Sequence, residues 1–162
     1  MKNSPSFRPP PSSVQVSAAM KRVRTKDTAP ELALRKLLFS VGLRYRIHYK
    51  PKSVALGRSN IDIAFPGAKL AVFVDGCFWH GCPDHGTIPK ANGDWWAEKL
   101  QDNRARDVRI SSVLIAAGWR VLRFWTHQSP ESMAVIVMDQ LHKNSITPQK
   151  PRSLHDTAQG ES

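Results

Sequence analysis

The sequence predicts an α/β domain whose elements follow in the order α-β-β-β-α-β-α. Residues 34–41 carry three leucines and a valine at helical spacing, residues 43–50 alternate between apolar and polar side chains, and residues 70–74 are apolar throughout. The chain has 162 residues and no internal repeat, so we expect one folded domain rather than two.

The first helix is predicted to begin at Thr28, because Thr28-Ala-Pro-Glu31 is a capping-box pattern. Gly42 provides its end. The unbroken alternation over residues 43–50 then predicts a half-exposed strand.

A hairpin is predicted next, from strands at residues 61–65 and 70–74 joined by a Pro66-Gly67 turn. The second strand of the hairpin is apolar on both faces. We therefore expect it at the centre of the sheet.

In the C-terminal part of the chain, the sequence predicts a long helix over residues 95–117. Its first half carries mostly charged side chains and its last turns carry apolar ones, and Gly118 ends it. Residues 119–125 predict a strand. Ser129 and Pro130 then open a last helix as its N-cap and first residue.

The net charge of +11 is concentrated before the predicted fold. Residues 1–26 hold six basic residues and no acid, whereas residues 27–142 hold 15 basic and 11 acidic residues. We expect a disordered basic, Pro-rich arm at residues 1–17, a folded domain at 18–143 and a disordered tail at 144–162. The arm could serve only as a solubilising tail, but a globular basic domain indicates a polyanionic partner, with nucleic acid as the first candidate.

Four cations directly before the first helix are the best candidates for phosphate contacts, because each neutralised phosphate releases counterions. They are Lys21, Arg22, Arg24 and Lys26. The chain has no apolar run long enough for a signal peptide or a membrane span, so we expect a soluble cytoplasmic protein, where cysteines bind metal more often than they form disulfides.

Asp62 stands between Ile61 and Ile63 in a strand that otherwise looks buried. An ionised carboxylate there is costly unless a cation or several donors meet it. A metal ligand is the preferred interpretation, and a carboxylate bonded to backbone at a strand end is the alternative.

The loop after the apolar strand concentrates metal-ligating residues. The spacing Cys77-x4-Cys82-x2-His85 offers three ligands for a structural zinc ion, and His127 is the best remaining candidate for the fourth. The alternative is a pair of free buried thiols.

Within the same loop, His80 could be either a zinc ligand or a general base acting near neutral pH, and the tight reversal around it favours the base. Phe78 and Trp79 are flanked by polar residues and glycine, which favours wedges inserted between DNA bases over core packing. For at least one of Trp95 and Trp96, core packing is the better interpretation.

From about Ser17 to His127 the chain resembles the very short patch repair (Vsr) endonucleases, DNA mismatch nicking enzymes with a restriction-endonuclease-like, PD-(D/E)xK-type fold. The resemblance rests on Thr28-Ala-Pro-Glu31, the Asp62 strand, Val74-Asp-Gly-Cys-Phe-Trp-His-Gly-Cys-Pro83, Trp96-x6-Asn103-x3-Asp107 and Gly118-Trp-Arg-Val-Leu. It implies a mixed central sheet flanked by helices. It also implies Mg²⁺-dependent nicking 5′ to the T of a T:G mismatch that arises when 5-methylcytosine deaminates.

Site residues carry over by the resemblance. Asp62 and the backbone carbonyl of Val74 would hold Mg²⁺, and His80 would activate water. Four more residues would complete the catalytic site: Glu31, Asp107, Asn103 and Asp75. Of these, Asp75 would hold a water molecule that is bound to the metal ion. The zinc ligands would be Cys77, Cys82, His85 and His127, and the wedges would be Phe78, Trp79 and Trp96, with Met20 entering from the other groove.

The chain departs from the family pattern at two places. Ile61 stands where the family usually has Pro, and Thr126-His127 replaces an acid-cysteine pair. Histidine remains a sound zinc ligand.

The resemblance further implies duplex DNA as the partner of a monomeric, nucleoid-associated, prokaryotic-type enzyme. It implies links to a cytosine-5 DNA methyltransferase, to mismatch-repair proteins and to a repair polymerase. Two rival functions remain at this point: a nuclease of the same fold that cuts unmismatched sites, and a zinc-stabilised DNA-binding module without catalysis.

Overall fold

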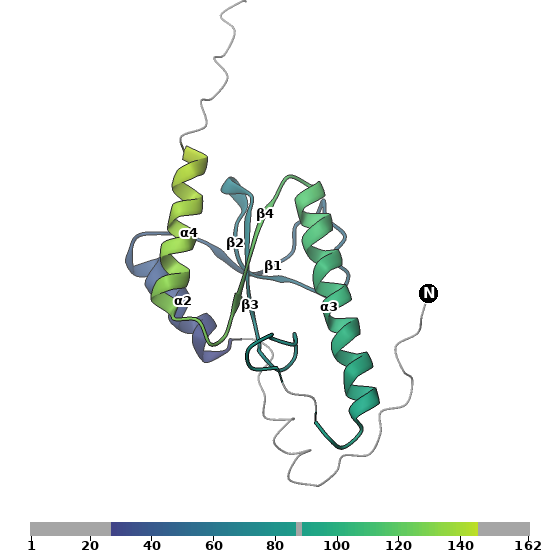
Figure 1. The fold of residues 1–162 in the computed structure, drawn as a ribbon. Helices are drawn as coiled ribbons and strands as arrows, with labels where there is room; N and C mark the ends of the chain where they lie inside the picture. The colour runs from purple at the N-terminus through teal and green to yellow at the C-terminus, as the bar shows by residue number, and fades with distance from the viewer. Residues whose placement is uncertain (1–26, 87–88, 146–162) are drawn as a thin grey trace, which may run out of the picture.

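The computed structural model describes residues 27–86 and 89–145, whose helices and strands are shown in Figure 1. In chain order the elements are α2 (Ala29–Ser40), β1 (Arg46–Tyr49), β2 (Ile61–Phe65), the short 3₁₀ helix η1 (Pro66–Ala68), β3 (Leu70–Asp75), α3 (Gly93–Ala116), β4 (Arg120–Trp125) and α4 (Pro130–Ser145). The predicted arm and most of the predicted tail lie outside the described residues.

The four strands form one mixed sheet in the order β1-β2-β3-β4. β1 pairs antiparallel with β2, β2 pairs antiparallel with β3, and β3 pairs parallel with β4 over its whole length, from Leu70 opposite Arg120 to Asp75 opposite Trp125. The mixed sheet flanked by helices is therefore confirmed, and so is the interior position of β3.

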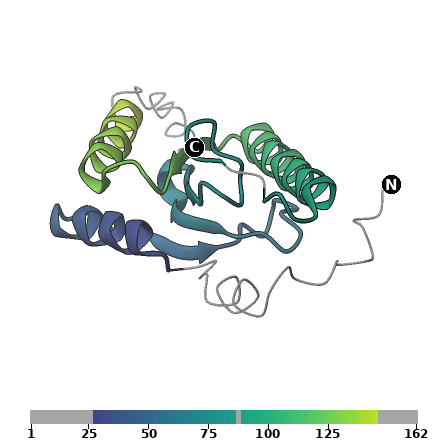
Figure 2. The same cartoon turned by 60° about the horizontal axis from the view of Figure 1, so that its bottom comes forward.

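Helices cover both faces of the sheet (Figures 1 and 2). α2 and α4 lie together on one face, where Leu34, Leu38 and Met133 pack against Ile63 and Val72. α3 lies on the other face and forms a second cluster with the alternate side chains of the strands, among them Ala71, Phe73, Ile110 and Leu114. A strand buried on both faces needs apolar residues at every position, which is the pattern of residues 70–74.

The first strand is shorter than predicted, because β1 covers only Arg46–Tyr49 of the expected 43–50. Within it His48 has a left-handed backbone with φ of 47°, although the pairing with β2 keeps one register from Arg46 to Tyr49. Alternation of side chains reports which faces are buried but not where the backbone departs from extended geometry.

The other boundaries differ by only a few residues. α3 begins at Gly93, two residues before the predicted start, and the last strand begins at Arg120 because Gly118 has φ of 80° and ends the helix before it. Between residues 27 and 145, apart from 87 and 88, no helix is both long and apolar enough to cross a bilayer.

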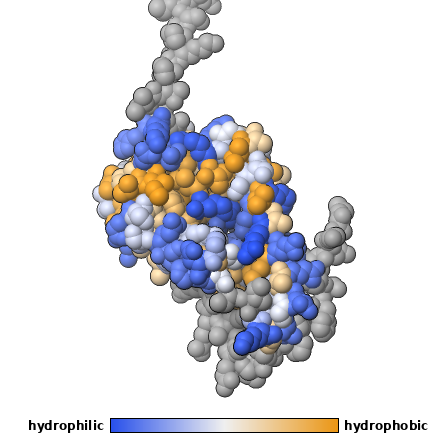
Figure 3. Space-filling model, viewed as in Figure 1, coloured by the Kyte–Doolittle hydropathy of each residue, from blue (hydrophilic) through white to orange (hydrophobic). Residues whose placement is uncertain are grey.

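The face seen in Figure 3 divides by hydropathy. Apolar side chains gather over the upper left, where α4 lies, and hydrophilic side chains predominate lower down, toward the start of α3.

Candidate active site

A cavity of about 470 Å³ opens where β2, β3, α3 and the loop after β3 meet. Its lining includes six of the predicted catalytic or metal-binding residues, which the structure therefore brings together: Asp62, Val74, Asp75, His80, Asn103 and Asp107. The strands alone cannot do this, because Asp107 comes from the middle of α3.

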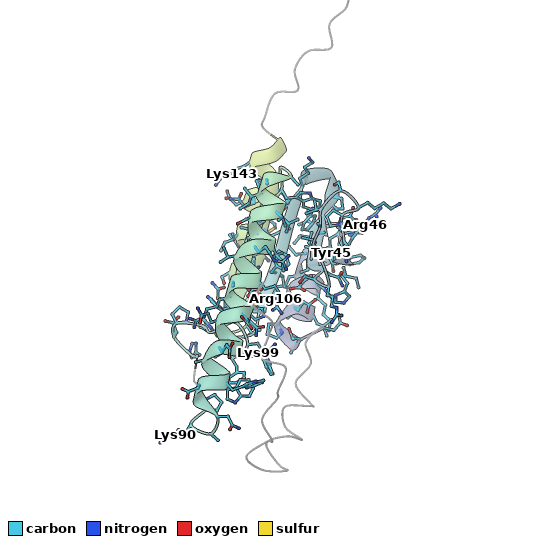
Figure 4. The ribbon with its side chains drawn as sticks, turned by 90° about the vertical axis from the view of Figure 1, so that its right-hand side faces the viewer. Tyr45, Arg46, Lys90, Lys99, Arg106 and Lys143 are labelled. Carbon is cyan, nitrogen blue, oxygen red and sulfur yellow. The ribbon has the colours of Figure 1, made fainter. Side chains whose placement is uncertain are left out.

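Basic side chains line the same cavity. Arg106 and Lys99 project from α3, as Figure 4 shows, and Arg58 comes from the segment before β2. A polyanion that enters the cavity therefore meets positive charge on two sides.

Asp62 lies in β2 and is largely enclosed. Its Oδ2 accepts a hydrogen bond from the Val74 backbone N–H at 3.0 Å. Burial, together with the charges of Glu31 and Asp75, raises the pKa of Asp62 to about 6, although the Val74 hydrogen bond and His48 oppose the rise. Carboxylate oxygens that repel one another in a partly dry site suit a hard divalent cation such as Mg²⁺, which would remove that repulsion.

His80 is oriented by Asp107, because His80 Nδ1 lies 2.5 Å from Asp107 Oδ2. The Nδ1 proton is then donated to the carboxylate, and Nε2 is the nitrogen that remains to accept a proton. Burial acts to raise the pKa of Asp107, but the His80 hydrogen bond and the charges of His80, Arg123 and Arg106 outweigh it and hold that pKa below its ordinary value. The pair has the form of a general base with its orienting carboxylate.

Arg123, in β4, connects the two acids around His80. Its Nε and Nη2 donate to the two oxygens of Asp75 at 2.7 and 2.8 Å, and Nη2 lies 3.2 Å from Asp107 Oδ1. The guanidinium carbon lies 4.7 Å from the centre of the Phe73 ring. Asp75 is thus engaged by a bidentate ion pair, a contact that spacing along the chain could not reveal.

Glu31 is buried at the start of α2 and forms an ion pair with Arg35. Its other oxygen accepts a hydrogen bond from the backbone N–H of the N-cap residue Thr28 at 3.4 Å. Glu31 is close enough to raise the pKa of Asp62, so it belongs to the acidic surroundings of the site.

Three residues of α3 hold three consecutive residues of the loop after β3. Asn103 Nδ2 donates to the Trp79 carbonyl at 2.9 Å, Asp107 binds His80, and Arg104 Nη2 donates to the Gly81 carbonyl at 3.1 Å. Gly81 has φ of 64°, and a Cβ there would lie 2.2 Å from the Arg104 guanidinium. The position of His80 therefore depends on one face of α3.

The four predicted zinc ligands converge. Ligand atoms of Cys77, Cys82, His85 and His127 all lie within 4.8 Å of one another. Cys77 Sγ is 3.2 Å from His127 Nδ1, and Cys82 Sγ is 3.7 Å from that nitrogen and 3.9 Å from His85 Nδ1. Tetrahedral zinc, with Zn–S of about 2.3 Å and Zn–N of about 2.0–2.1 Å, separates sulfur from nitrogen by about 3.6 Å, so the donor set fits the ion.

The predicted wedge residues form one aromatic cluster. Phe78 and Trp79 are half-buried and meet edge to face, with ring centres 5.1 Å apart. Trp96 is only 8% exposed and packs against both, with ring centres at 5.2 and 5.9 Å, and the Trp95 ring lies 4.8 Å from that of Trp96. Phe78 and Trp79 are therefore placed at the surface, whereas a base contact by Trp96 would require the first turn of α3 to move.

The five DNA contacts predicted in the segment directly before α2 lie outside the described residues. They are Met20, Lys21, Arg22, Arg24 and Lys26.

The sequence reasoning missed several residues of the site. Arg123, Arg58 and His48 all line the cavity. A cation within a strand, at Arg123, was an available signal, since an inward-facing charge needs a partner. His48 gave no signal, because it occupied an expected polar position in the alternating strand.

Residues 12–84 match the family described as DNA mismatch endonuclease Vsr. A protein named Type II nicking enzyme V.NaeI, from Lentzea aerocolonigenes, is 42% identical over 134 residues, which are 83% of this chain and 81% of that protein. Type II nicking enzyme V.XorIIP, from Xanthomonas oryzae pv. oryzae, is 46% identical over 107 residues, 65% of this chain and 75% of the relative. DNA mismatch endonuclease Vsr of Escherichia coli (strain K12) is 34% identical over 110 residues, 67% of each chain.

Proposed function

Because the chain belongs to the Vsr family of DNA mismatch endonucleases, we propose that it hydrolyses one phosphodiester 5′ to the T of a T:G mismatch in duplex DNA, in a Mg²⁺-dependent reaction. The observation that carries the proposal is the hydrogen-bonded His80–Asp107 pair in one cavity with the largely enclosed Asp62. A module that only binds DNA would have no use for an enclosed acid in one cavity with an oriented base. The names of the relatives, which are nicking enzymes, support cleavage of one strand.

The catalytic ion would be held by Asp62 and the backbone carbonyl of Val74. Bound Mg²⁺ supplies positive charge for the phosphate oxygens in the pentavalent transition state. Glu31 adds to the negative potential that attracts the ion.

His80 is the base. With Nδ1 held by Asp107, Nε2 removes a proton from the attacking water, and the carboxylate stabilises the imidazolium that results. Arg123 binds Asp107 and Asp75 and so holds both carboxylates in place, and its charge helps to keep the pKa of Asp107 below its ordinary value. Asn103 positions the base indirectly, through the Trp79 carbonyl.

Selection of the mismatch is a matter of DNA deformation. Phe78 and Trp79 would enter the base stack, and a T:G wobble pair costs less to unstack than a Watson–Crick pair. Met20, with Trp96 after a shift of α3, would complete the wedge. The cations Lys21, Arg22, Arg24 and Lys26 would bind the DNA backbone beside the mismatch.

The structural ion is zinc in this proposal, held by Cys77, Cys82, His85 and His127. It would tie the loop after β3 to the end of β4 and so hold Phe78, Trp79 and His80 in place. T:G mismatches follow the deamination of 5-methylcytosine, so we place the protein with a cytosine-5 methyltransferase and, after the nick, with mismatch-repair proteins and a repair polymerase.

The test is a nicking assay on labelled duplexes that differ only in one pair, T:G or T:A, over a set of flanking sequences. We expect Mg²⁺-dependent cleavage of the T strand of the heteroduplex alone. His80→Ala should reduce the rate at least about 100-fold while heteroduplex binding persists, because an unassisted water remains. His142→Ala, in the last turn of α4, is the matched control.

Equal cutting of both strands of the T:A duplex would instead assign a restriction-type function. Binding without any cleavage, in either Mg²⁺ or Mn²⁺, would assign a non-catalytic module.

A further inference from the structure

A second histidine–carboxylate pair borders the same cavity. His48 Nε2 lies 3.2 Å from Asp27 Oδ1, and His48 lines the cavity with Asp62 and His80. Asp27 is held in turn by Arg35 Nη1 at 2.5 Å, and the hydrogen bond from Arg35 holds the pKa of Asp27 below its ordinary value. Neither Asp27 nor His48 has a part in the mechanism described above.

Both members of this pair have unusual backbone conformations. Asp27 has φ of 53° and His48 has φ of 47°, in the left-handed region that side chains other than glycine seldom adopt. Such residues cost on the order of 1–3 kcal/mol each and are concentrated at functional sites. Of the four residues other than glycine that have positive φ in the described part of the chain, these two meet through their side chains.

The register of the sheet places His48 next to the proposed metal ligand. Ile47 pairs with Ile63 and Tyr49 with Ile61, so His48 stands opposite Asp62 across the β1–β2 ladder. His80 follows β3, on the other side of Asp62 in the strand order, where Asp107 and Arg123 hold it. Two imidazoles therefore flank Asp62 from opposite directions.

Cleavage of a phosphodiester needs two proton transfers on opposite sides of phosphorus. The attacking water must lose a proton, and the departing 3′-oxygen must gain one, because an alkoxide is a poor leaving group. His80 meets the first need in the proposed function, which leaves the second without a residue.

We propose that His48 is the general acid that protonates the 3′-oxygen leaving group, an inference that rests on the proposed nuclease function. The water oxygen bonds to phosphorus as His80 Nε2 takes its proton. The P–O3′ bond breaks, its electron pair remains on O3′, and O3′ takes the proton from His48 Nδ1. Asp27 accepts the hydrogen bond from Nε2–H and stays ionised, so it is a positioning residue for this acid. The products are a 3′-hydroxyl and a 5′-phosphate.

The experiment compares two T:G duplexes. One has the ordinary oxygen at the scissile bond, and the other has sulfur in place of the bridging 3′-oxygen, because a thiolate leaves without a proton. The variants are His48→Gln, whose amide can still donate to Asp27, and His48→Asn, which tolerates the left-handed backbone. His142→Gln on α4 is the matched control, and all rates are single-turnover rates in Mn²⁺, which tolerates sulfur.

We expect both His48 variants to cleave the oxygen duplex about 100-fold more slowly than wild type and the sulfur duplex within a few-fold of it. Asp27→Asn should follow the same pattern with a smaller loss, and His80→Ala should lose activity on both duplexes. The melting temperature of each variant identifies any variant that fails to fold. If one of the two His48 variants does not fold, the other is compared with wild type.

Two results would overturn the assignment of His48. Equal losses on the oxygen and sulfur duplexes would make His48 a structural residue, and unchanged cleavage of the oxygen duplex would remove it from the reaction. If wild type cleaves neither duplex, the proposed function itself fails, whereas a wild type that cleaves beside equally active His48 variants refutes only the role of His48.

Discussion

At the scale of single residues, the surroundings of each aspartate in the cavity set its pKa. Asp62 is an acid in an enclosed place, near other carboxylates, and its pKa is raised to about 6. Asp107 is an acid surrounded by cations, and its pKa is lowered. The two aspartates of one cavity are thus suited to different tasks. Asp62 is suited to binding a cation, and Asp107 is suited to holding the imidazole of His80.

Asp62→Asn should make the protein more stable and abolish nicking. The folded-state pKa of about 6 exceeds the ordinary 3.8, so the folded state binds the proton more tightly, and the ionised carboxylate reduces stability above pH 6. The difference corresponds to about 3 kcal/mol at pH 7.5, and it should vanish as pH falls from 6 to below 4. Urea unfolding in Mg²⁺-free buffer across this range measures it, with Asp139→Asn on α4 as control. The prediction would be wrong if Asp62→Asn lowered the free energy of unfolding by the same amount at every pH.

Arg123→Gln should destabilise the fold, because the buried Asp75 then loses its bidentate partner. We expect a loss of about 3 kcal/mol at pH 7.5, the range for breaking a buried ion pair. Adding Asp75→Asn should recover part of the loss, which a double-mutant cycle of unfolding free energies would measure. Arg109→Gln, exposed on α3, should change stability little.

At the scale of elements, the loop after β3 carries many of the proposed site residues, and its described residues form turns but no helix or strand. α3 holds it from one side through Asn103, Arg104 and Asp107. The Cys77, Cys82, His85 and His127 cluster ties it to the end of β4. In the proposed function both attachments hold the loop, so the proposed zinc ion and α3 would position the same histidine, His80.

Removal of the structural metal should therefore cost both stability and activity. Treatment with a zinc chelator, followed by dialysis into Mg²⁺, should lower the melting temperature and leave nicking low until zinc is returned. Elemental analysis should give one zinc per chain, and none in Cys77→Ser. Full nicking by a chain shown to be free of zinc would be the contrary result.

Asn103→Ala separates the two attachments. The Trp79 carbonyl loses its donor, so we expect slower nicking with zinc still bound and the melting temperature lowered by only a few degrees. Single-turnover rates and zinc content measured on the same preparation check it. Gln101→Ala, exposed on the same helix, provides the baseline.

At the scale of the whole molecule, basic and acidic residues are unevenly divided along the chain, which fits the two tasks of the proposed function, binding DNA and cutting it. The six cations of residues 1–26 face no acids in that segment, whereas residues 27–142 keep 11 acids with their 15 cations. A protein that merely bound DNA would gain by losing acids near the phosphates. Metal-dependent hydrolysis needs them, and the cavity collects Asp62, Asp75 and Asp107.

Deletion of residues 1–26 should weaken DNA binding and reduce its salt dependence. If all six cations contact phosphates, the slope of log K against log salt should fall by about 5, and by less if only the four nearest α2 do. Binding isotherms at several salt concentrations measure the slope. A slope equal to that of the full chain would mean that the arm only solubilises the protein.

Much of the fold and of the site was predictable from the sequence because the signals are local. Periodicity predicted the helices and the interior strand, and the ligands Cys77, Cys82 and His85 lie within nine residues of one another, so their spacing alone indicates a metal site. The tertiary structure decided the contacts between distant segments: Arg123 on Asp75, Asp107 on His80 and Asp27 on His48. Sequence determines the residue types and the local spacing. Only strand register and helix packing determine which nitrogen of each histidine is held and which remains free to move a proton, because those contacts join residues that are 21 to 48 positions apart.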